Sequence, residues 1–441
     1  MQTYSADNHV QPVQQAERIK TVDMIRGFAL LGILLMNVPG FGINFDFWQS
    51  VMTGPENTKD FFAFATMMTF FEGTMRGLFS MLFGAGMILF TLNKKDRPMG
   101  PTVTEYYYRR LLWLVLFGVF NAFVLLWFGD ILFFYGLCGM MLYAFRNTNP
   151  KWLLVLGFVC MSVTMLKQQL NWNEVTDKRK AYNEAITATK EGKKLTGEQE
   201  AAKAEWAEME KNRKPDSAIV NRNLRKMRAG YITTYQYMIP RNAGSETWDM
   251  YHFLFWDGLT MMFIGMALFG WGFFSNKLSS STYGMWLLVG YGIGIPISWF
   301  VLHSGSLVET RTFGLYVDRY FVNHNLLYDV RRVLLSLGHA SLLMLIFRSN
   351  VVPWLMKALA NVGQMAFTNY LMQSIISTTF FYGFGFGWYN KLQFHELYYY
   401  VGIVWVFQLI FSSIWLKYFR FGPFEWLWRS LTYWQAQPMK R

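Results

Sequence analysis

The residues of this sequence that could do chemistry include charged side chains placed beside or inside apolar runs. Asp23 and Arg26 stand three residues apart, immediately before the apolar run 28–38. On a helix this spacing puts both on one face, where they can form an ion pair. An ionisable group deeper in a bilayer costs roughly 2.5–3.5 kcal/mol. The pair therefore either fixes the end of a membrane helix at the bilayer boundary or belongs to a functional site.

Two further acid–arginine pairs occur in other apolar segments. Glu72 and Arg76 have i, i+4 spacing with the acid first, which is the favourable order on a helix. Asp329 and Arg332 are three residues apart at the start of a later apolar run. The two pairs predict a polar seam inside a helical bundle, and this seam is either structural or part of a site.

Single polar residues in the apolar segments add other candidates. Asp130 lies in a tight Gly-Asp turn, where it either caps the following helix or serves a substrate or a proton. His339 stands in the middle of an apolar run, as a hydrogen-bonded packing residue or as a base. Asn369 and Gln373 share a helix face, and we expect them to line the same seam.

The remaining histidines and the cysteines are weaker candidates. His303 and His324 fall at the ends of apolar runs, where we expect interfacial anchoring. No group of His, Cys, Asp and Glu has the spacing of a zinc site, so we expect no metal. Cys138 and Cys160 lie within apolar runs, which predicts small buried side chains without a disulfide.

The elements that must position these residues are membrane helices. Apolar residues make up 53% of the 441 residues and aromatic residues 19%, while only 16% are charged. Segment lengths predict an all-α, polytopic membrane bundle of about ten spans. The predicted spans are 25–43, 68–92, 108–128, 130–146, 152–170, 252–274, 283–303, 325–347, 362–384 and 397–419.

The distribution of Lys and Arg predicts the orientation. Basic residues cluster at alternate ends of the predicted spans, so both termini are expected in the cytoplasm. The net charge of +13 is then explained by retention of basic ends in the cytoplasm, and no nucleic-acid partner is expected. The chain divides into a cytoplasmic segment 1–24, a first bundle 25–170, a polar extracytoplasmic loop 171–250, a second bundle 251–419 and a cytoplasmic tail 420–441.

The polar loop 171–250 is the one clear change in composition. It mixes Lys, Arg and Glu with few large apolar residues, and 198–211 has high helix propensity. We expect a solvated helical excursion without a core of its own. The alternative is a lid over a site in the membrane.

Five strings of residues resemble one known family. They are DMIRGFALLGILLMN at 23–37, LFSMLFGAG at 78–86, WFGDIL at 127–132, VGQMAFTNYLMQS at 362–374 and FRFGPFEWLWR at 419–429. In this order they resemble the YeiB-like bacterial membrane proteins, which carry a domain of unknown function, DUF418. The resemblance covers nearly the whole chain and fails only in the polar loop.

That family in turn resembles a wider superfamily of membrane acyltransferases through the Arg-Gly opening of its first span. Those enzymes move acyl groups from carriers such as acyl-CoA onto exported acceptors. One branch has a His where this chain has Asn37, and YeiB-like relatives have a His near the position of Asn121. Asn takes up no proton in the useful pH range but can orient a carbonyl or hydroxyl. A lost or relocated base is therefore expected.

The resemblance implies a membrane acyltransferase-like protein of the bacterial cytoplasmic membrane, acting on an envelope lipid or glycan. An acyl-CoA or another thioester carrier would be the donor, Arg26 and Arg76 would hold its phosphates, and Asp130 or His339 would move a proton. The expected catalytic residues are Asp130, His339 and Asn121. The expected substrate-binding residues are Asp23, Arg26, Asn37, Glu72, Arg76, Arg332, Asn369 and Gln373. The alternative function is a transporter or a lipid- or small-molecule-binding protein on the same scaffold; membrane lipids are expected partners in either case.

Overall fold

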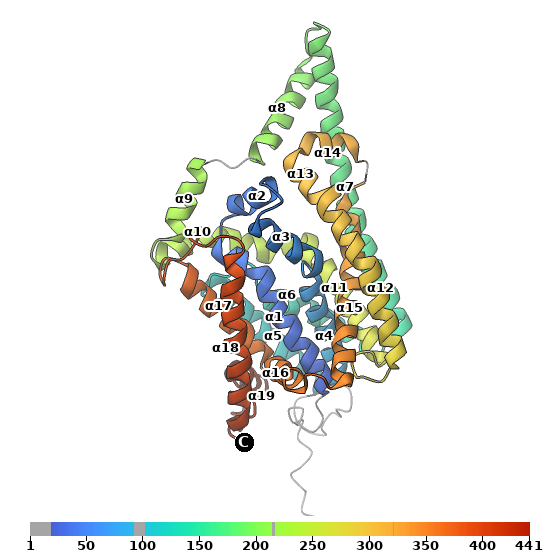
Figure 1. The fold of residues 1–441 in the computed structure, drawn as a ribbon, viewed down its shortest axis with the longest axis vertical. Coiled ribbons are helices and arrows are strands. Elements are labelled where there is room, and N and C mark those ends of the chain that lie inside the picture. Colours follow the sequence, from blue (N-terminus) through green and yellow to red (C-terminus); the bar gives the residue numbers. More distant parts are fainter. Residues whose placement is uncertain (1–18, 92–101, 214–216, 321) are drawn as a thin grey trace, which may run out of the picture.

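The computed structural model describes residues 19–91, 102–213, 217–320 and 322–441, and every regular element in these ranges is a helix (Figure 1). The predicted all-α membrane bundle is confirmed. In chain order the helices are α1 (Lys20–Gly42), α2 (Phe45–Thr53), α3 (Lys59–Phe70), α4 (Thr74–Thr91), α5 (Val103–Phe123), α6 (Leu132–Leu142), η2 (Tyr143–Phe145), α7 (Pro150–Lys190), α8 (Gly197–Asn212), α9 (Ser217–Met227), α10 (Tyr231–Gly244), η3 (Ser245–Leu254), α11 (Phe255–Gly270), α12 (Ser280–Phe300), η4 (Val301–Ser306), α13 (Leu307–Arg311), α14 (Phe313–Arg319), η5 (His324–Leu327), α15 (Tyr328–Ser349), α16 (Pro353–Gln364), α17 (Ala366–Phe381), α18 (Glu396–Tyr418) and α19 (Pro423–Tyr433).

Seven helical segments of the described chain are long and apolar enough to cross a membrane, where the sequence predicted about ten. They are Lys20–Gly42, Lys59–Thr91, Pro150–Lys190, Tyr231–Gly270, Ser280–Arg311, His324–Ser349 and Glu396–Tyr418. The fourth predicted span falls mostly on α6, whose 11 residues rise only about 16 Å against a hydrocarbon core of about 30 Å. The ninth is interrupted at Met365, between α16 and α17.

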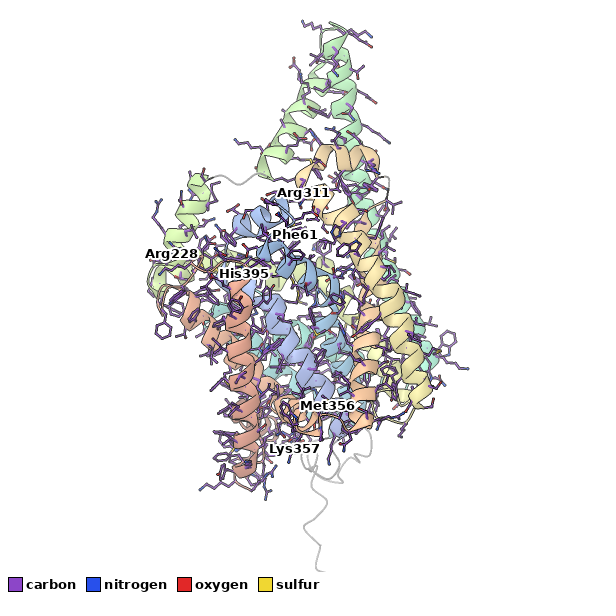
Figure 2. All side chains as sticks on the ribbon, viewed as in Figure 1. Phe61, Arg228, Arg311, Met356, Lys357 and His395 are labelled. Atoms are coloured by element: carbon purple, nitrogen blue, oxygen red, sulfur yellow. The ribbon has the colours of Figure 1, made fainter. Side chains whose placement is uncertain are left out.

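The bundle has two ends that differ in character. The end where α1 begins and α19 lies is called the terminal end, and Met356 and Lys357 lie there. The opposite end carries the projecting α7–α8 pair and is called the hairpin end; Arg311 and His395 lie toward it (Figure 2). His395 Nδ1 is 2.7 Å from Asp60 Oδ1, which ties the start of α18 to α3.

Helix α1 lies at the centre of the bundle and contacts α4, α15, α16, α17 and α18. Glycines permit its closest approach to α16. A Cβ at Gly363 would lie 1.8 Å from the Asp23 carbonyl oxygen, and a Cβ at Gly27 would lie 2.0 Å from the Leu359 carbonyl oxygen. Small residues let membrane helices pack backbone to backbone in this way.

Helices from both sides of the polar loop share one hydrophobic core. α11 packs against α4 and α7, and α16 packs against α1. At the α4–α11 contact a Cβ at Gly84 would lie 2.2 Å from the Met262 carbonyl oxygen. The two groups of spans defined by sequence therefore interleave, and their division into separate units stays a prediction.

The polar loop contributes Trp172 and Trp206 to a small core at the hairpin end, which it shares with Phe313, Tyr316 and Val317 of α14. The helical excursion is therefore packed against a later segment of the chain. α7 continues to Lys190, and α8 returns beside it. Trp206 of α8 is fully buried and stacks on Phe313, with ring centroids 5.3 Å apart. Trp172 joins this cluster, and Arg179 pairs with Asp318 at 2.6 Å. A few large aromatic side chains are enough to anchor an otherwise charged hairpin.

Candidate functional site

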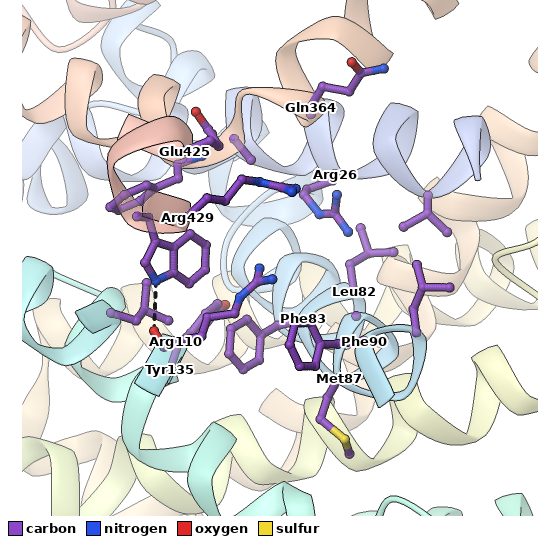
Figure 3. A pocket seen from close by; sticks show the side chains of 18 of the residues that line it. Arg26, Leu82, Phe83, Met87, Phe90, Arg110, Tyr135, Gln364, Glu425 and Arg429 are labelled. Carbon is purple, nitrogen blue, oxygen red and sulfur yellow. Dashed lines mark hydrogen bonds between the residues drawn. The ribbon is translucent and has the colours of Figure 1, made fainter. Parts of the chain in front are cut away.

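A cavity of about 250 Å³ opens at the terminal end, between α1, α4, α5, the α16–α17 junction and α19 (Figure 3). We call it the terminal cavity. Its apolar floor includes Phe79, Leu82, Phe83, Met87, Leu111 and Leu114. Arg26, Arg110 and Arg429 also line it, and Figure 3 shows their side chains extending toward the same space. The cavity thus joins three guanidinium groups to an apolar interior.

Each arginine is held in place by local contacts. Arg26 Nη1 donates to Asp23 Oδ1 at 2.6 Å, so the predicted ion pair on the first turns of α1 is confirmed. The Arg110 guanidinium lies over the Trp428 ring, 4.1 Å from its centroid, and Trp428 Nε1 donates to the Arg110 carbonyl oxygen at 2.8 Å (Figure 3). Arg429 lies over an aromatic ring of the same C-terminal segment. Stacking on aromatic rings keeps the planes of the Arg110 and Arg429 guanidinium groups oriented.

Glu425 fixes the wall that carries Arg429. Its carboxylate accepts the backbone N–H groups of Phe367 at 2.7 Å and Thr368 at 3.0 Å, and also the Thr368 hydroxyl. It thereby caps the start of α17 and docks α19 against it. Burial raises the pKa of Glu425.

Arg110, Glu425 and Arg429 were not among the site residues predicted from the sequence. The available signal was the string FRFGPFEWLWR, which places one acid and two arginines among aromatic residues of an amphipathic tail. These three residues complete the polar rim of the terminal cavity.

Two predicted site residues, Asn121 and Asp130, lie behind one wall of the terminal cavity. Tyr370 lines the cavity, and its hydroxyl is 3.4 Å from Asp130 Oδ1. Asn121 Nδ2 donates to the same oxygen at 2.7 Å, and Phe133 N donates to Oδ2 at 2.9 Å. Asp130 therefore caps α6, as one of its two interpretations predicted, and it is also bonded to Asn121. The structure brings these two candidates together behind Tyr370.

A second wall leads to a buried ionic cluster. Tyr135 lines the cavity, and its hydroxyl is 3.4 Å from the Arg76 carbonyl oxygen. Arg76 Nη2 pairs with Asp257 Oδ2 at 3.2 Å, and Asp257 Oδ1 pairs with Arg332. Arg332 is fully buried and lies 3.3 Å from Asp329 Oδ1, so the pair three residues apart is confirmed. The predicted polar seam exists, with Asp257 of α11 as a central member that sequence analysis missed.

The predicted pair of Glu72 with Arg76 is wrong. Glu72 pairs with Arg331 and accepts a hydrogen bond from the Tyr328 hydroxyl at 3.2 Å. α3 ends before Glu72, and Gly73 turns the chain at φ +70° before α4 begins. The i, i+4 geometry of a continuous helix is therefore lost, and each side chain points to a different partner.

Other predicted residues lie elsewhere. His339 bridges helices, with Nδ1 2.7 Å from the Tyr291 hydroxyl and Nε2 2.9 Å from a carbonyl oxygen of α3. Asn369 donates to a serine of α18 at 2.9 Å, and Gln373 donates to a glutamine of α18 at 3.0 Å. These two residues join α17 to α18 and are not part of the ionic cluster. Asn37 is half-buried near the end of α1.

The described ranges contain neither a cluster of metal-binding side chains nor a disulfide. No three His, Cys, Asp or Glu side chains there gather as a metal site. Cys138 and Cys160 are buried free thiols.

The fold and the site define a multi-pass, all-helical membrane protein with a charged cavity at one end. The chain belongs to the YeiB-like DUF418 family. It is 30% identical over 439 residues to "Uncharacterized protein YxaH" of Bacillus subtilis (strain 168), covering 98% of each chain. It is also 30% identical over 435 residues to "Uncharacterized protein YeiB" of Escherichia coli (strain K12), covering 96% of this chain and 98% of the relative. The family profile described as "Protein of unknown function (DUF418)" matches residues 268–435. No solved structure matches the chain.

Proposed function

We propose that this chain is an acyltransferase-like protein of the bacterial cytoplasmic membrane, and that the terminal cavity binds the phosphate-bearing acyl carrier. The observation that supports the proposal is the placement of Arg26, Arg110 and Arg429 around one cavity with an apolar floor. Guanidinium groups match phosphate oxygens in geometry and charge, and an apolar floor suits an acyl chain. A small polar metabolite would leave that floor without a partner.

The orientation expected from the basic residues supports this choice of donor. Short basic segments such as that around Lys417 lie at the terminal end, which the positive-inside rule assigns to the cytoplasm. Thioester carriers are cytosolic, so a cavity on that side meets the donor directly. The acceptor would be a hydroxyl of an envelope lipid or glycan.

Two groups that can move a proton beside the cavity are the Tyr370 hydroxyl and the Asp130 carboxyl. In acyl transfer the acceptor oxygen attacks the thioester carbonyl carbon, the C–S bond breaks, and the acceptor proton passes to a base. Asp130 would take that proton through Tyr370, and Asn121 would hold the carboxylate in position. This arrangement would take the place of the histidine that the family resemblance implies near the position of Asn121.

Binding and turnover test the proposal separately. Arg110→Gln should weaken binding of a long-chain acyl-CoA at least tenfold in isothermal titration, because a charge-assisted hydrogen bond contributes about 1.5–3 kcal/mol. Arg225→Gln, on the exposed face of α9, is the matched control and should bind as wild type does. Asp130→Asn should abolish thioester turnover while binding persists. Unchanged binding in Arg110→Gln would contradict the proposal.

A second candidate function is transport of an amphipathic anion. The observation that favours it is a series of polar contacts between side chains, which begins at Tyr135 in the lining of the terminal cavity and continues through Arg76. Arg76 Nη2 is 3.4 Å from the Tyr328 hydroxyl, and Tyr328 lines a second cavity. Acyl-CoA binding without turnover, together with movement of a labelled lipid across proteoliposomes, would favour this candidate.

A further inference from the structure

A second, smaller cavity lies between the end of α3, the end of α12 with η4, and the start of α15. It measures about 110 Å³. Its polar lining consists of Glu72, Ser298, Ser306, Asn325, Tyr328 and Arg331. This volume exceeds the minimum of roughly 10–15 Å³ for one water several-fold, so a small polar group fits. The cavity is distinct from the terminal cavity and shares no lining residue with it.

One residue of this lining contacts a buried histidine. Ser306 Oγ is 3.4 Å from His324 Nε2, and His324 Nδ1 is hydrogen-bonded to the Tyr316 hydroxyl. His324 is only 8% exposed, so its predicted role as an interfacial anchor is wrong. Gly305 makes the approach possible, because a Cβ there would lie 2.5 Å from His324 Cγ.

The order of these contacts matches that of an activated nucleophile. When the Tyr316 hydroxyl accepts the proton on Nδ1, the lone pair of Nε2 faces the Ser306 hydroxyl. Glu309 Oε2 lies 4.0 Å from the same nitrogen and can stabilise the imidazolium ion once it forms. Glu309 is itself paired with Arg213 of the hairpin at 3.3 Å. A nucleophile, a base and a group that orients the base are therefore present together.

An unsatisfied group in the cavity points to a ligand. The Ser298 hydroxyl is buried, lines the cavity, and has no hydrogen-bond partner among the described residues. Buried polar groups are normally paired, so a bound polar group would complete its hydrogen bonding. Arg331, whose Nη2 is paired with Glu72 in the same lining, has a buried Nε–H without a hydrogen-bond partner among the described residues. Both features suit a carbonyl or carboxylic ester oxygen.

We propose that Ser306 is a nucleophile activated by His324, and that the second cavity accepts a carboxylic acyl ester. Ser306 Oγ attacks the ester carbonyl carbon while His324 Nε2 takes its proton. The bond between that carbon and the ester oxygen then breaks, and the imidazolium returns the proton to the leaving alcohol. The acyl group remains on Ser306 as an ester until water or another hydroxyl attacks it. This second reactive centre goes beyond the proposed function and needs no carrier in the terminal cavity.

A fluorophosphonate probe, which forms a covalent bond with activated serines, tests the proposal on the full-length protein in detergent. Mass spectrometry should place the adduct on Ser306. The adduct should be lost in Ser306→Ala and should form at least tenfold more slowly in both His324→Gln and His324→Asn. Ser304→Ala, in the same helical turn, is the matched control and should label as wild type does.

Two outcomes would overturn the proposal. One is an unlabelled wild-type protein whose melting curve shows that it is folded, and the other is labelling that survives in Ser306→Ala. Tyr316→Phe should slow labelling without abolishing it, because the ring stays while the acceptor for Nδ1–H is removed; wild-type speed in this variant would overturn the role of Tyr316. Arg110→Gln should label normally, so failure of carrier binding and failure of this inference are distinguished.

Discussion

Replacing Asp257 by Asn should strongly destabilise the protein. The Asp257 carboxylate is the shared partner of Arg76 and Arg332, which come from two other helices. An asparagine of the same shape removes the charge and turns an N–H₂ group toward one of the two guanidinium groups. Both cations then stay in the bundle without their main counter-ion.

The magnitude follows from the burial of the two arginines. Breaking one partner of a buried ion pair costs about 3–5 kcal/mol, because the remaining charge is left uncompensated. Arg332 is fully buried, while the Arg76 side chain is 31% exposed and can recover some hydration. Asp329 stays 3.3 Å from Arg332 and compensates part of the loss. The expected cost is therefore near the lower limit, about 3 kcal/mol.

The free energy of unfolding in mixed micelles measures this cost, with helical circular dichroism as the signal. Asp249→Asn is the matched control, since Asp249 is exposed in the preceding η3 segment and should leave the unfolding curve unchanged. A loss below about 1 kcal/mol in Asp257→Asn would refute the reasoning, because it would mean that the cluster is hydrated or rearranges without cost.

Three further predictions concern packing, acid sensitivity and orientation. Gly363→Ala should cost about 1–3 kcal/mol by forcing α1 and α16 apart, whereas Gly402→Ala has open space and should not; equal melting temperatures would contradict the close contact. The hydrogen bond from Arg179 of α7 lowers the pKa of Asp318 below the ordinary 3.8. The ion pair therefore stabilises the folded protein above pH 3.8, and this stabilisation is lost as the pH falls through the lowered pKa. The melting temperature of Asp318→Asn should therefore differ from wild type at pH 7 and converge with it in acid; a gap that persists in acid would exclude this ion pair as its cause. A reporter fused after Arg441 should be cytoplasmic and one inserted near Thr196 extracytoplasmic, and the reverse pattern would overturn the orientation.

Features that depend on local sequence were predictable. The length and polarity of an apolar run are properties of that run alone, so α1, α15 and α18 were found near their true limits. The pair of Asp23 with Arg26 was found because both residues lie on one continuous helix. Glu72 and Arg76 have an equally suitable spacing, but the turn at Gly73 separates them.

Features that depend on distant segments were not predictable from spacing. Asp257 joins the ionic cluster through Arg332, which lies 75 residues further along the chain. The arginines that line the terminal cavity come from α1, α5 and α19. The hydrophobic periodicity of one helix does not indicate which other helices pack against it. The hairpin core was missed because Trp206 is a single large residue within a charged stretch, where composition dominates the signal.

The most direct test of the terminal cavity as a binding site for an amphipathic anion is photo-crosslinking with a long-chain acyl-CoA that carries a photoreactive group in its acyl chain. The label should fall on the cavity floor, at 79–90 of α4 and near Leu111 of α5. Unlabelled acyl-CoA should compete, and the double variant Arg110→Gln/Arg429→Gln should lose the label. Labelling spread over lipid-facing side chains such as the exposed Leu288, and unchanged in the double variant, would contradict the assignment.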